Sequence, residues 1–221
     1  VGAGASNDDE AEAATRATSS GPSSQPPPEM RWALRLEPAP SSGFALQGLL
    51  DAKRVAVVDA GSGLAELVAD RLLQRGIPAA AAAPDASTDG VIFLGGLVDA
   101  DGVEDATRVQ RAAFEAAKAV AAKLTTEPGV FVTVQDTGGD FGLSGSERAW
   151  LGGLPGLVKT AAQEWPHAGT RAIDLERGGR DAAQLADVLV DELLTGGTPR
   201  PRGASGGGTE VALRADCARA T

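Results

Sequence analysis

The sequence predicts an α/β protein with a truncated Rossmann-like, three-layer fold and a mostly parallel sheet. Three observations predict it: buried strand patterns alternate with helical patterns, glycine-rich turns follow three of the strands, and 43% of the 221 residues are hydrophobic. Sheets of this kind place their functional loops at the carboxyl ends of the strands. We therefore look for a site at the glycine-rich turns 61–63, 95–96 and 138–139.

The first 29 residues are predicted to be a disordered, acidic and proline-rich linker. Residues 1–29 consist mainly of Ala, Ser, Pro, Gly and acidic residues, and they include the run Pro26–Pro28. A segment with so little apolar surface cannot offset the entropy lost on ordering. We predict a Rossmann-like domain over residues 30–214 and a C-terminal tail over residues 215–221.

Periodicity predicts the elements of the domain in order. Alternating apolar and polar residues at 31–37 are typical of a half-exposed strand. Apolar runs predict further strands at 54–58, 77–83, 89–94, 129–134, 171–175 and 210–213. Apolar residues three or four apart predict helices between Gly63 and Gly76, over 103–124, over 154–165 and around 185–193. Only four residues, 85–88, separate the strands at 77–83 and 89–94, so the strand–helix–strand segment usual at this place is shortened.

The composition excludes several classes of function. Twenty basic and 30 acidic residues give a net charge of −10, which argues against binding to nucleic-acid phosphates. A single Cys and a single His exclude an intrachain disulfide and a zinc site of the Cys/His type, so no metal is expected. The chain has neither a long apolar run nor a secretion-signal pattern, so we expect a cytoplasmic protein without nucleic-acid or membrane partners.

The turn after the first buried strand is a degraded dinucleotide-binding motif. Gly61 and Gly63, on either side of Ser62, fill two of the three glycine positions of the fingerprint, but Glu66 stands at the third. A carboxylate in the first turn of the following helix would repel a bound phosphate. We therefore expect Gly61, Ser62 and Gly63 to form a vestigial glycine loop, and we expect this chain to bind no cofactor.

The order of elements resembles that of the short-chain dehydrogenase/reductase family. That resemblance implies a catalytic Tyr, a Lys four residues later and an upstream Ser. Lys159 falls in the expected helix, but Pro155 stands four residues before it, and the chain contains no Tyr. Ser144 and Ser146 therefore have no phenol to act with, and no catalytic residue is expected. Lys159 is predicted to be a solvated helix lysine.

Three other reactive side chains have structural explanations. His167 is expected in a turn at the end of a helix, next to the last carbonyls. Asp174, near the end of a strand, is expected to cap a backbone segment or to pair with an arginine. Cys217 is expected to be a free thiol at the surface.

Four segments together resemble one family more closely: residues 130–139, 152–166, 171–175 and 210–214. They are similar to the structural half of the split ketoreductase of type I polyketide synthases and polyunsaturated fatty acid synthases, over roughly residues 30–214. This resemblance implies a non-catalytic scaffold that stabilises a catalytic half, which binds NADPH. The implied partners are that catalytic ketoreductase subdomain, an acyl carrier protein and neighbouring synthase domains. The chain alone is then not an enzyme.

Two other functions stay open. One is a divergent NADP-dependent short-chain reductase that acts on ketoacyl thioesters through Lys159 and a serine. The other is a small-ligand-binding Rossmann-like module with a crevice at Gly61, Gly95 and Gly138. Titration with cofactor tests the first, and a ligand-dependent rise in melting temperature without turnover indicates the second.

Overall fold

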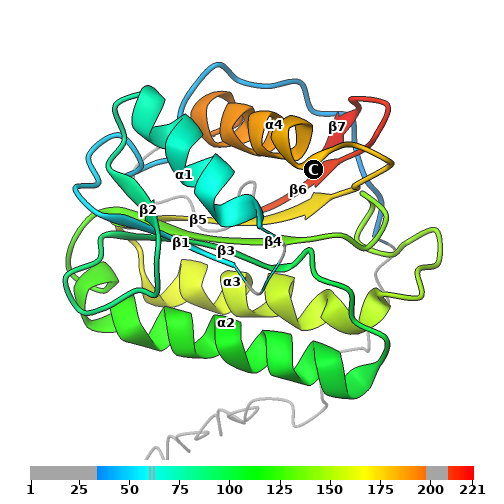
Figure 1. Ribbon diagram of the computed structural model, residues 1–221, viewed down its shortest axis with the longest axis horizontal. Coiled ribbons are helices and arrows are strands. Elements are labelled where there is room, and N and C mark those ends of the chain that lie inside the picture. Colours follow the sequence, from blue (N-terminus) through cyan, green and yellow to red (C-terminus); the bar gives the residue numbers. More distant parts are fainter. Residues whose placement is uncertain (1–33, 60, 62, 198–208) are drawn as a thin grey trace, which may run out of the picture. The chain divides into compact units, whose positions relative to one another are not determined.

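A seven-stranded sheet forms the middle layer of the unit that spans residues 35–221 (Figure 1). The computed structural model describes residues 34–59, 61, 63–197 and 209–221, so the predicted linker over 1–29 and Ser62 lie outside the described residues. In chain order the strands are β1 (Val55–Val58), β2 (Ala79–Ala81), β3 (Gly90–Gly96), β4 (Gly129–Gln135), β5 (Ala168–Leu175), β6 (Glu210–Leu213) and β7 (Arg219–Ala220).

The strands lie in the order β2-β1-β3-β4-β5-β6-β7, and all neighbours are parallel except the pair β6–β7. This arrangement confirms the predicted Rossmann-like α/β fold with a mostly parallel sheet. The sheet ends at β2 on one side, since the chain passes from β2 to β3 through the short segment 82–89. The order reverses between β1 and β3, because β2 lies on one side of β1 and β3 on the other.

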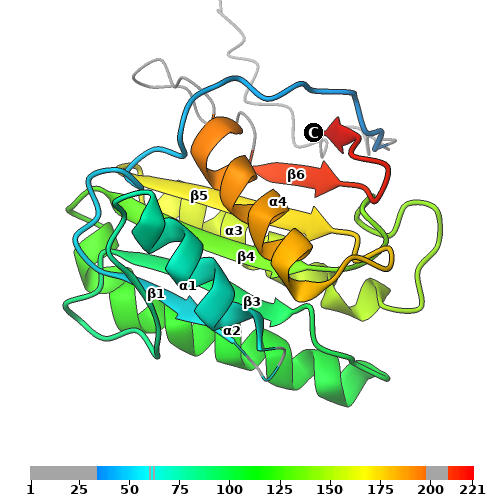
Figure 2. The ribbon, with the colours of Figure 1, turned by 45° about the horizontal axis from the view of Figure 1, so that its top comes forward.

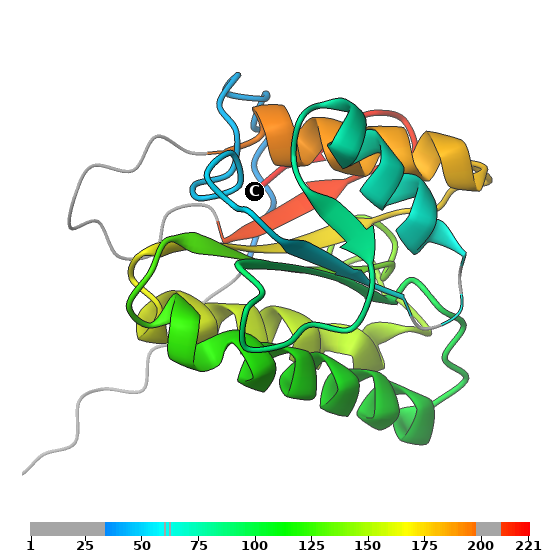
Figure 3. The same ribbon diagram turned by 60° about the vertical axis from the view of Figure 1, so that its left-hand side comes forward.

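Helices cover both faces of the sheet (Figures 1 and 3). Helices α1 (Leu64–Gln74) and α4 (Ala182–Thr195) pack on one face. Helices α2 (Val103–Leu124) and α3 (Gly153–Glu164), with the short 3₁₀ helix η1 (Ala149–Gly152), pack on the other. Each falls within a few residues of the predicted range. Among the described residues, no helix has both the length and the apolar character needed to cross a membrane.

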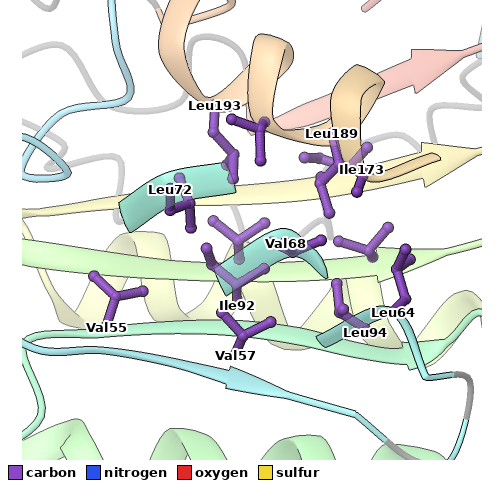
Figure 4. Packing of buried hydrophobic residues seen from close by; sticks show 14 of the residues in the cluster. Val55, Val57, Leu64, Val68, Leu72, Ile92, Leu94, Ile173, Leu189 and Leu193 are labelled. Atoms are coloured by element: carbon purple, nitrogen blue, oxygen red, sulfur yellow. The ribbon is translucent and has the colours of Figure 1, made fainter. Parts of the chain in front are cut away.

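Alternation along the strands produces two separate cores. In β4, Val130, Val132 and Val134 face α1 and α4, whereas Phe131 faces α2 and α3. There the Phe131 ring meets Trp165 edge to face, with ring centroids 5.5 Å apart. Figure 4 shows labelled members of the first core, which are Val55, Val57, Leu64, Val68, Leu72, Ile92, Leu94, Ile173, Leu189 and Leu193.

The N-terminal strand prediction is wrong in its described part. Residues 34–37 form no strand, although Glu37 and Thr221 exchange backbone hydrogen bonds of 3.0 Å in both directions. Residues 215–221, expected only as a tail, contain β7 (Figure 2). A tight turn at Cys217, whose φ is +67°, sends the chain back so that β7 pairs antiparallel with β6. Glu37 therefore lies beside β7, at the edge of the sheet.

Candidate functional site

A pocket of about 300 Å³ lies at the carboxyl edge of the sheet, where the strand order reverses between β1 and β3. We call it the edge pocket; its lining residues are Gly61, Leu64, Leu97, Val98, Asp99, Arg177, Ala182 and Leu185. They come from the turns after β1, β3 and β5 and from the N-terminal parts of α1 and α4. Parallel sheets bind ligands at such switch points. The edge pocket, with its mainly apolar wall, is therefore the candidate site.

Asp59 caps the first turn of α1 beside the edge pocket. Its carboxylate accepts hydrogen bonds from the backbone N–H groups of Gly61 (3.0 Å), Leu64 (3.0 Å) and Ala65 (3.5 Å). Gly61 and Gly63 have φ values of +109° and +70°, which allow the backbone to turn around this carboxylate. The amide groups at the start of α1 are thus taken by a side chain of the same chain.

The charged wall of the edge pocket is an ion-pair network. The Arg177 guanidinium lies 3.0 Å from an Asp99 carboxylate oxygen and 3.0 Å from an Asp136 carboxylate oxygen. Burial opposes the charge of Arg177, but the hydrogen bonds and charges of these two carboxylates raise its pKa. Asp99 is exposed, and its hydrogen bond with Arg177 and the charge of that group lower its pKa. Arg177 is the cation that an anionic ligand in the edge pocket would meet.

Arg148 ties together the ends of β3 and β4 behind this network. Its guanidinium donates to the carbonyl oxygens of Asp136 (2.8 Å), Gly96 (3.0 Å) and Val98 (2.6 Å). A fourth contact, of 3.4 Å, reaches Asp99. Burial, with the charge of Arg177 next, lowers the pKa of Arg148. Since Val98 and Asp99 line the edge pocket, Arg148 holds one of its walls in place.

Asp174 anchors the loop that follows β4. This fully buried carboxylate accepts hydrogen bonds from the Thr137 N–H (2.6 Å), the Thr137 hydroxyl (2.8 Å) and the Phe141 N–H (2.6 Å). Burial raises its pKa, although these hydrogen bonds act in the opposite direction. The expected cap is present, but its described partners belong to this loop and not to an arginine. The register that pairs Gln135 with Asp174 brings the loop amides to it.

The reductase-type residues of the sequence lie apart from the edge pocket. Pro155 is buried in α3. Lys159 is half exposed, as expected, and pairs with Glu210 at 2.9 Å on the face of the sheet opposite α1 and α4. His167 is exposed after α3, and Cys217 is an exposed free thiol. Within the described ranges, no group of three or more His, Cys, Asp or Glu residues is placed to hold a metal ion.

Of the glycines predicted to line a crevice, Gly61 alone is among the residues that line the edge pocket, whereas Gly95 and Gly138 are not. Asp59, Arg148 and Arg177 were not singled out by the sequence patterns. A signal existed for Asp59, since an Asp just before a glycine turn and a helix is a typical acceptor for helix amides. No local motif marks Arg148 or Arg177.

No family model matches the sequence, and no curated protein matches it. Among solved structures, the chain is similar to the bulky-bulky ketone specific alcohol dehydrogenase from Comamonas testosteroni, with 16% identity over 67% of this chain and 87% of that chain and a TM-score of 0.46. It is also similar to a short chain dehydrogenase from Mycobacterium smegmatis, with 14% identity over 76% of this chain and 99% of that chain and a TM-score of 0.43. The likeness to these two structures is one of fold alone.

One functional prediction needs correction. The prediction that the chain alone is not an enzyme is wrong, because both neighbours of this fold are dehydrogenases, which are oxidoreductases. The structure confirms the Rossmann-like arrangement that the resemblance to short-chain dehydrogenases and reductases implies, and the likeness to the two solved dehydrogenases is one of fold alone. The finer resemblance, to the structural half of a synthase ketoreductase, stays a prediction.

Proposed function

We propose that the chain is a divergent reductase unit of the short-chain dehydrogenase/reductase type, which acts on ketoacyl thioesters with NADPH. The observation that carries the proposal is the edge pocket, at the switch point of the sheet and beside the first glycine turn. Sheets of this architecture hold nucleotide cofactors at that place. The apolar wall formed by Leu97, Val98 and Leu185 suits the nucleoside end of such a cofactor.

The residues fit this cofactor only in part. Arg177 offers a guanidinium to an anionic group of the ligand, at the expense of its ion pairs with Asp99 and Asp136. The amide groups at the start of α1, which hold a pyrophosphate in dinucleotide-binding folds, are occupied by Asp59. When bound, NADPH would supply the hydride for reduction of a ketone.

The proton that completes a ketone reduction needs a donor other than a phenol, because the chain contains no Tyr. We propose that a second ketoreductase subdomain supplies this donor and that an acyl carrier protein presents the thioester. What supports this part is the resemblance of residues 130–139 and 152–166 to synthase ketoreductases. The position four residues before Lys159 is occupied by the buried Pro155, which has no side-chain proton, so α3 offers no proton donor there.

Titration of the purified chain with NADPH, followed by cofactor fluorescence, tests the proposal. We expect saturable binding with a Kd on the order of 100 μM. We also expect the purified chain to oxidise NADPH with a short β-ketoacyl thioester, and we expect a second ketoreductase subdomain to raise this rate above the sum of the rates of the two proteins assayed separately. Arg177→Met is expected to weaken binding about tenfold, since it removes a charge-assisted contact.

Arg180→Met is the matched control, because Arg180 donates to the backbone oxygens of Glu176 and Arg214 and does not line the edge pocket. It should leave the affinity for NADPH unchanged. The proposal fails if NADPH does not bind to the purified chain, or if it binds and the chain oxidises none of it with the thioester.

A further inference from the structure

The amide groups that border the edge pocket already hold an anion, the carboxylate of Asp59. Gly61 and Leu64 line the pocket, and the N–H groups of both donate to this carboxylate at 3.0 Å. The N–H of Ala65, also in α1, donates at 3.5 Å to the same carboxylate oxygen that accepts from the N–H of Leu64. A phosphate at the start of α1 would need the same donors.

Asp59 and a phosphate cannot share these donors. Each N–H group carries one hydrogen, and two anions within hydrogen-bond distance of the same groups repel each other. Glu66, exposed in the first turn of α1, adds a further negative charge at this end of the helix. The wall of the pocket next to these donors is apolar and is formed by Leu64, Leu97 and Leu185.

We propose that Asp59 is an internal competitor that sets the charge preference of the edge pocket. The pocket then holds the uncharged nucleoside end of a ligand such as NADPH, and a pyrophosphate gains the amides of α1 only when the Asp59 carboxylate is displaced from them. This inference deepens the proposed function and rests on it only in using the same pocket. It makes Asp59 the residue that limits affinity for phosphorylated ligands.

Binding of adenosine and of ADP to the full chain tests the inference without any assay of activity. The native chain should bind adenosine at least as tightly as ADP. Asp59→Asn removes the charge but retains an acceptor that can cap α1, and Asp59→Ala removes both. Each variant should bind ADP about tenfold more tightly than the native chain, because a repulsive charge is gone. Its affinity for adenosine should stay unchanged.

Asp85→Asn is the control, because Asp85 accepts from the Ser87 N–H at 2.8 Å in a surface turn and does not line the pocket. It should change neither affinity. Melting curves of both Asp59 variants establish that α1 remains folded. The inference is overturned if ADP binds no better to the Asp59 variants than to the native chain, or if neither ligand binds to any variant.

The two proposals fail in different ways. Reduction of a ketoacyl thioester without an effect of Asp59 on ADP binding would overturn the inference and leave the proposed function intact. The expected pattern of ADP and adenosine binding, without any turnover of NADPH, would overturn the proposed function alone.

Discussion

Arg171 and Glu192 form an ion pair inside the protein, with Nη1 2.9 Å from Oε1 and neither side chain more than 3% exposed. Arg171 belongs to β5 and Glu192 to α4. Arg219 of β7 approaches the same carboxylate, with Nε 2.7 Å from Oε2. Both arginines also donate to the carbonyl oxygen of Gly196, at the end of α4. One buried carboxylate thus joins a central strand, a covering helix and the last strand of the sheet.

Replacing Glu192 by Gln should destabilise the protein severely. The substitution leaves the Arg171 guanidinium buried without an opposite charge, which costs about 3–5 kcal/mol of unfolding free energy. Urea unfolding followed by circular dichroism measures this loss. The control is Asp105→Asn, which breaks the pair with the exposed Arg108 on α2 and should cost far less stability. Equal losses for the two variants would contradict this account of the buried pair.

The buried carboxyl of Asp174 should make stability fall as pH rises above about 3.8, the ordinary pKa of Asp. Burial raises the pKa of Asp174 in the folded state, so between 3.8 and that higher value the folded protein holds more protons than the unfolded chain. The stabilisation is complete below 3.8 and is lost as pH rises through the folded pKa. The measurement is the difference in unfolding free energy between the native chain and Asp174→Asn as a function of pH.

The contribution of Asp89 to stability should depend on pH in the direction opposite to that of Asp174. Burial alone would raise its pKa, but the hydrogen bond from Lys123 and the N–H groups of Lys53 and Arg54 together lower it. The contribution of Asp89 to stability is therefore present above about 3.8 and lost as pH falls through its folded pKa. A stability difference for Asp174→Asn that changes with pH in the same direction as that for Asp89→Asn would refute the assignment for Asp174.

The elements that the sequence pattern predicted well are those whose burial is local and periodic. In α2, small apolar residues recur every three or four positions from Ala106 to Leu124, and the predicted range 103–124 is the observed helix. β7 escaped prediction because two residues have no period, and its pairing depends on the turn at Cys217. The strand expected at 31–37 has an alternating pattern, but in its described part only Glu37 bonds to the segment of β7, and the antiparallel bridge to β7 falls at Pro38, just past the predicted range.

The candidate site was predictable in position but not in chemistry. The glycine-rich turns, which include 61–63, indicated the carboxyl edge of a parallel sheet, and the edge pocket, lined by Gly61, lies at that edge. Arg148 and Arg177 reach that edge from loops that carry no motif, and their partners lie up to 78 positions away along the chain. Contacts between residues so far apart depend on the folded arrangement, and a single sequence does not reveal them.

Gly129 should not tolerate a methyl group. A Cβ there would lie 2.1 Å from the carbonyl oxygen of Asp89 and 2.4 Å from a side-chain carbon of Leu124. We expect Gly129→Ala to lower the unfolding free energy by about 1–3 kcal/mol, because β3 and β4 must move apart. Gly156→Ala, in α3, meets nothing within 4 Å and should instead stabilise the protein by up to about 1 kcal/mol. Thermal melts of both variants measure these changes. An unfolding free energy unchanged by Gly129→Ala would show that the two strands can separate without cost.

Replacing Arg148 by Lys should loosen the wall of the edge pocket while keeping its charge. The planar guanidinium reaches the carbonyl oxygens of Gly96, Val98 and Asp136 together, whereas an ammonium group cannot match that fork. The Gly96 carbonyl keeps the N–H of Asp136 as a donor at 3.1 Å. A carbonyl group left without a donor costs about 1–3 kcal/mol when buried, so for Val98 and Asp136 together we expect a loss of about 2 kcal/mol in stability. Hydrogen exchange should rise at the Leu97 amide, next to these carbonyl groups, and the affinity of the edge pocket for its ligand should fall.

The control is Arg71→Lys, at an ion pair with Asp187 on the surface, and it should change neither the exchange rate at Leu97 nor the affinity. Unaltered exchange at Leu97 in Arg148→Lys would mean that the pocket wall is held by the backbone of β3 alone.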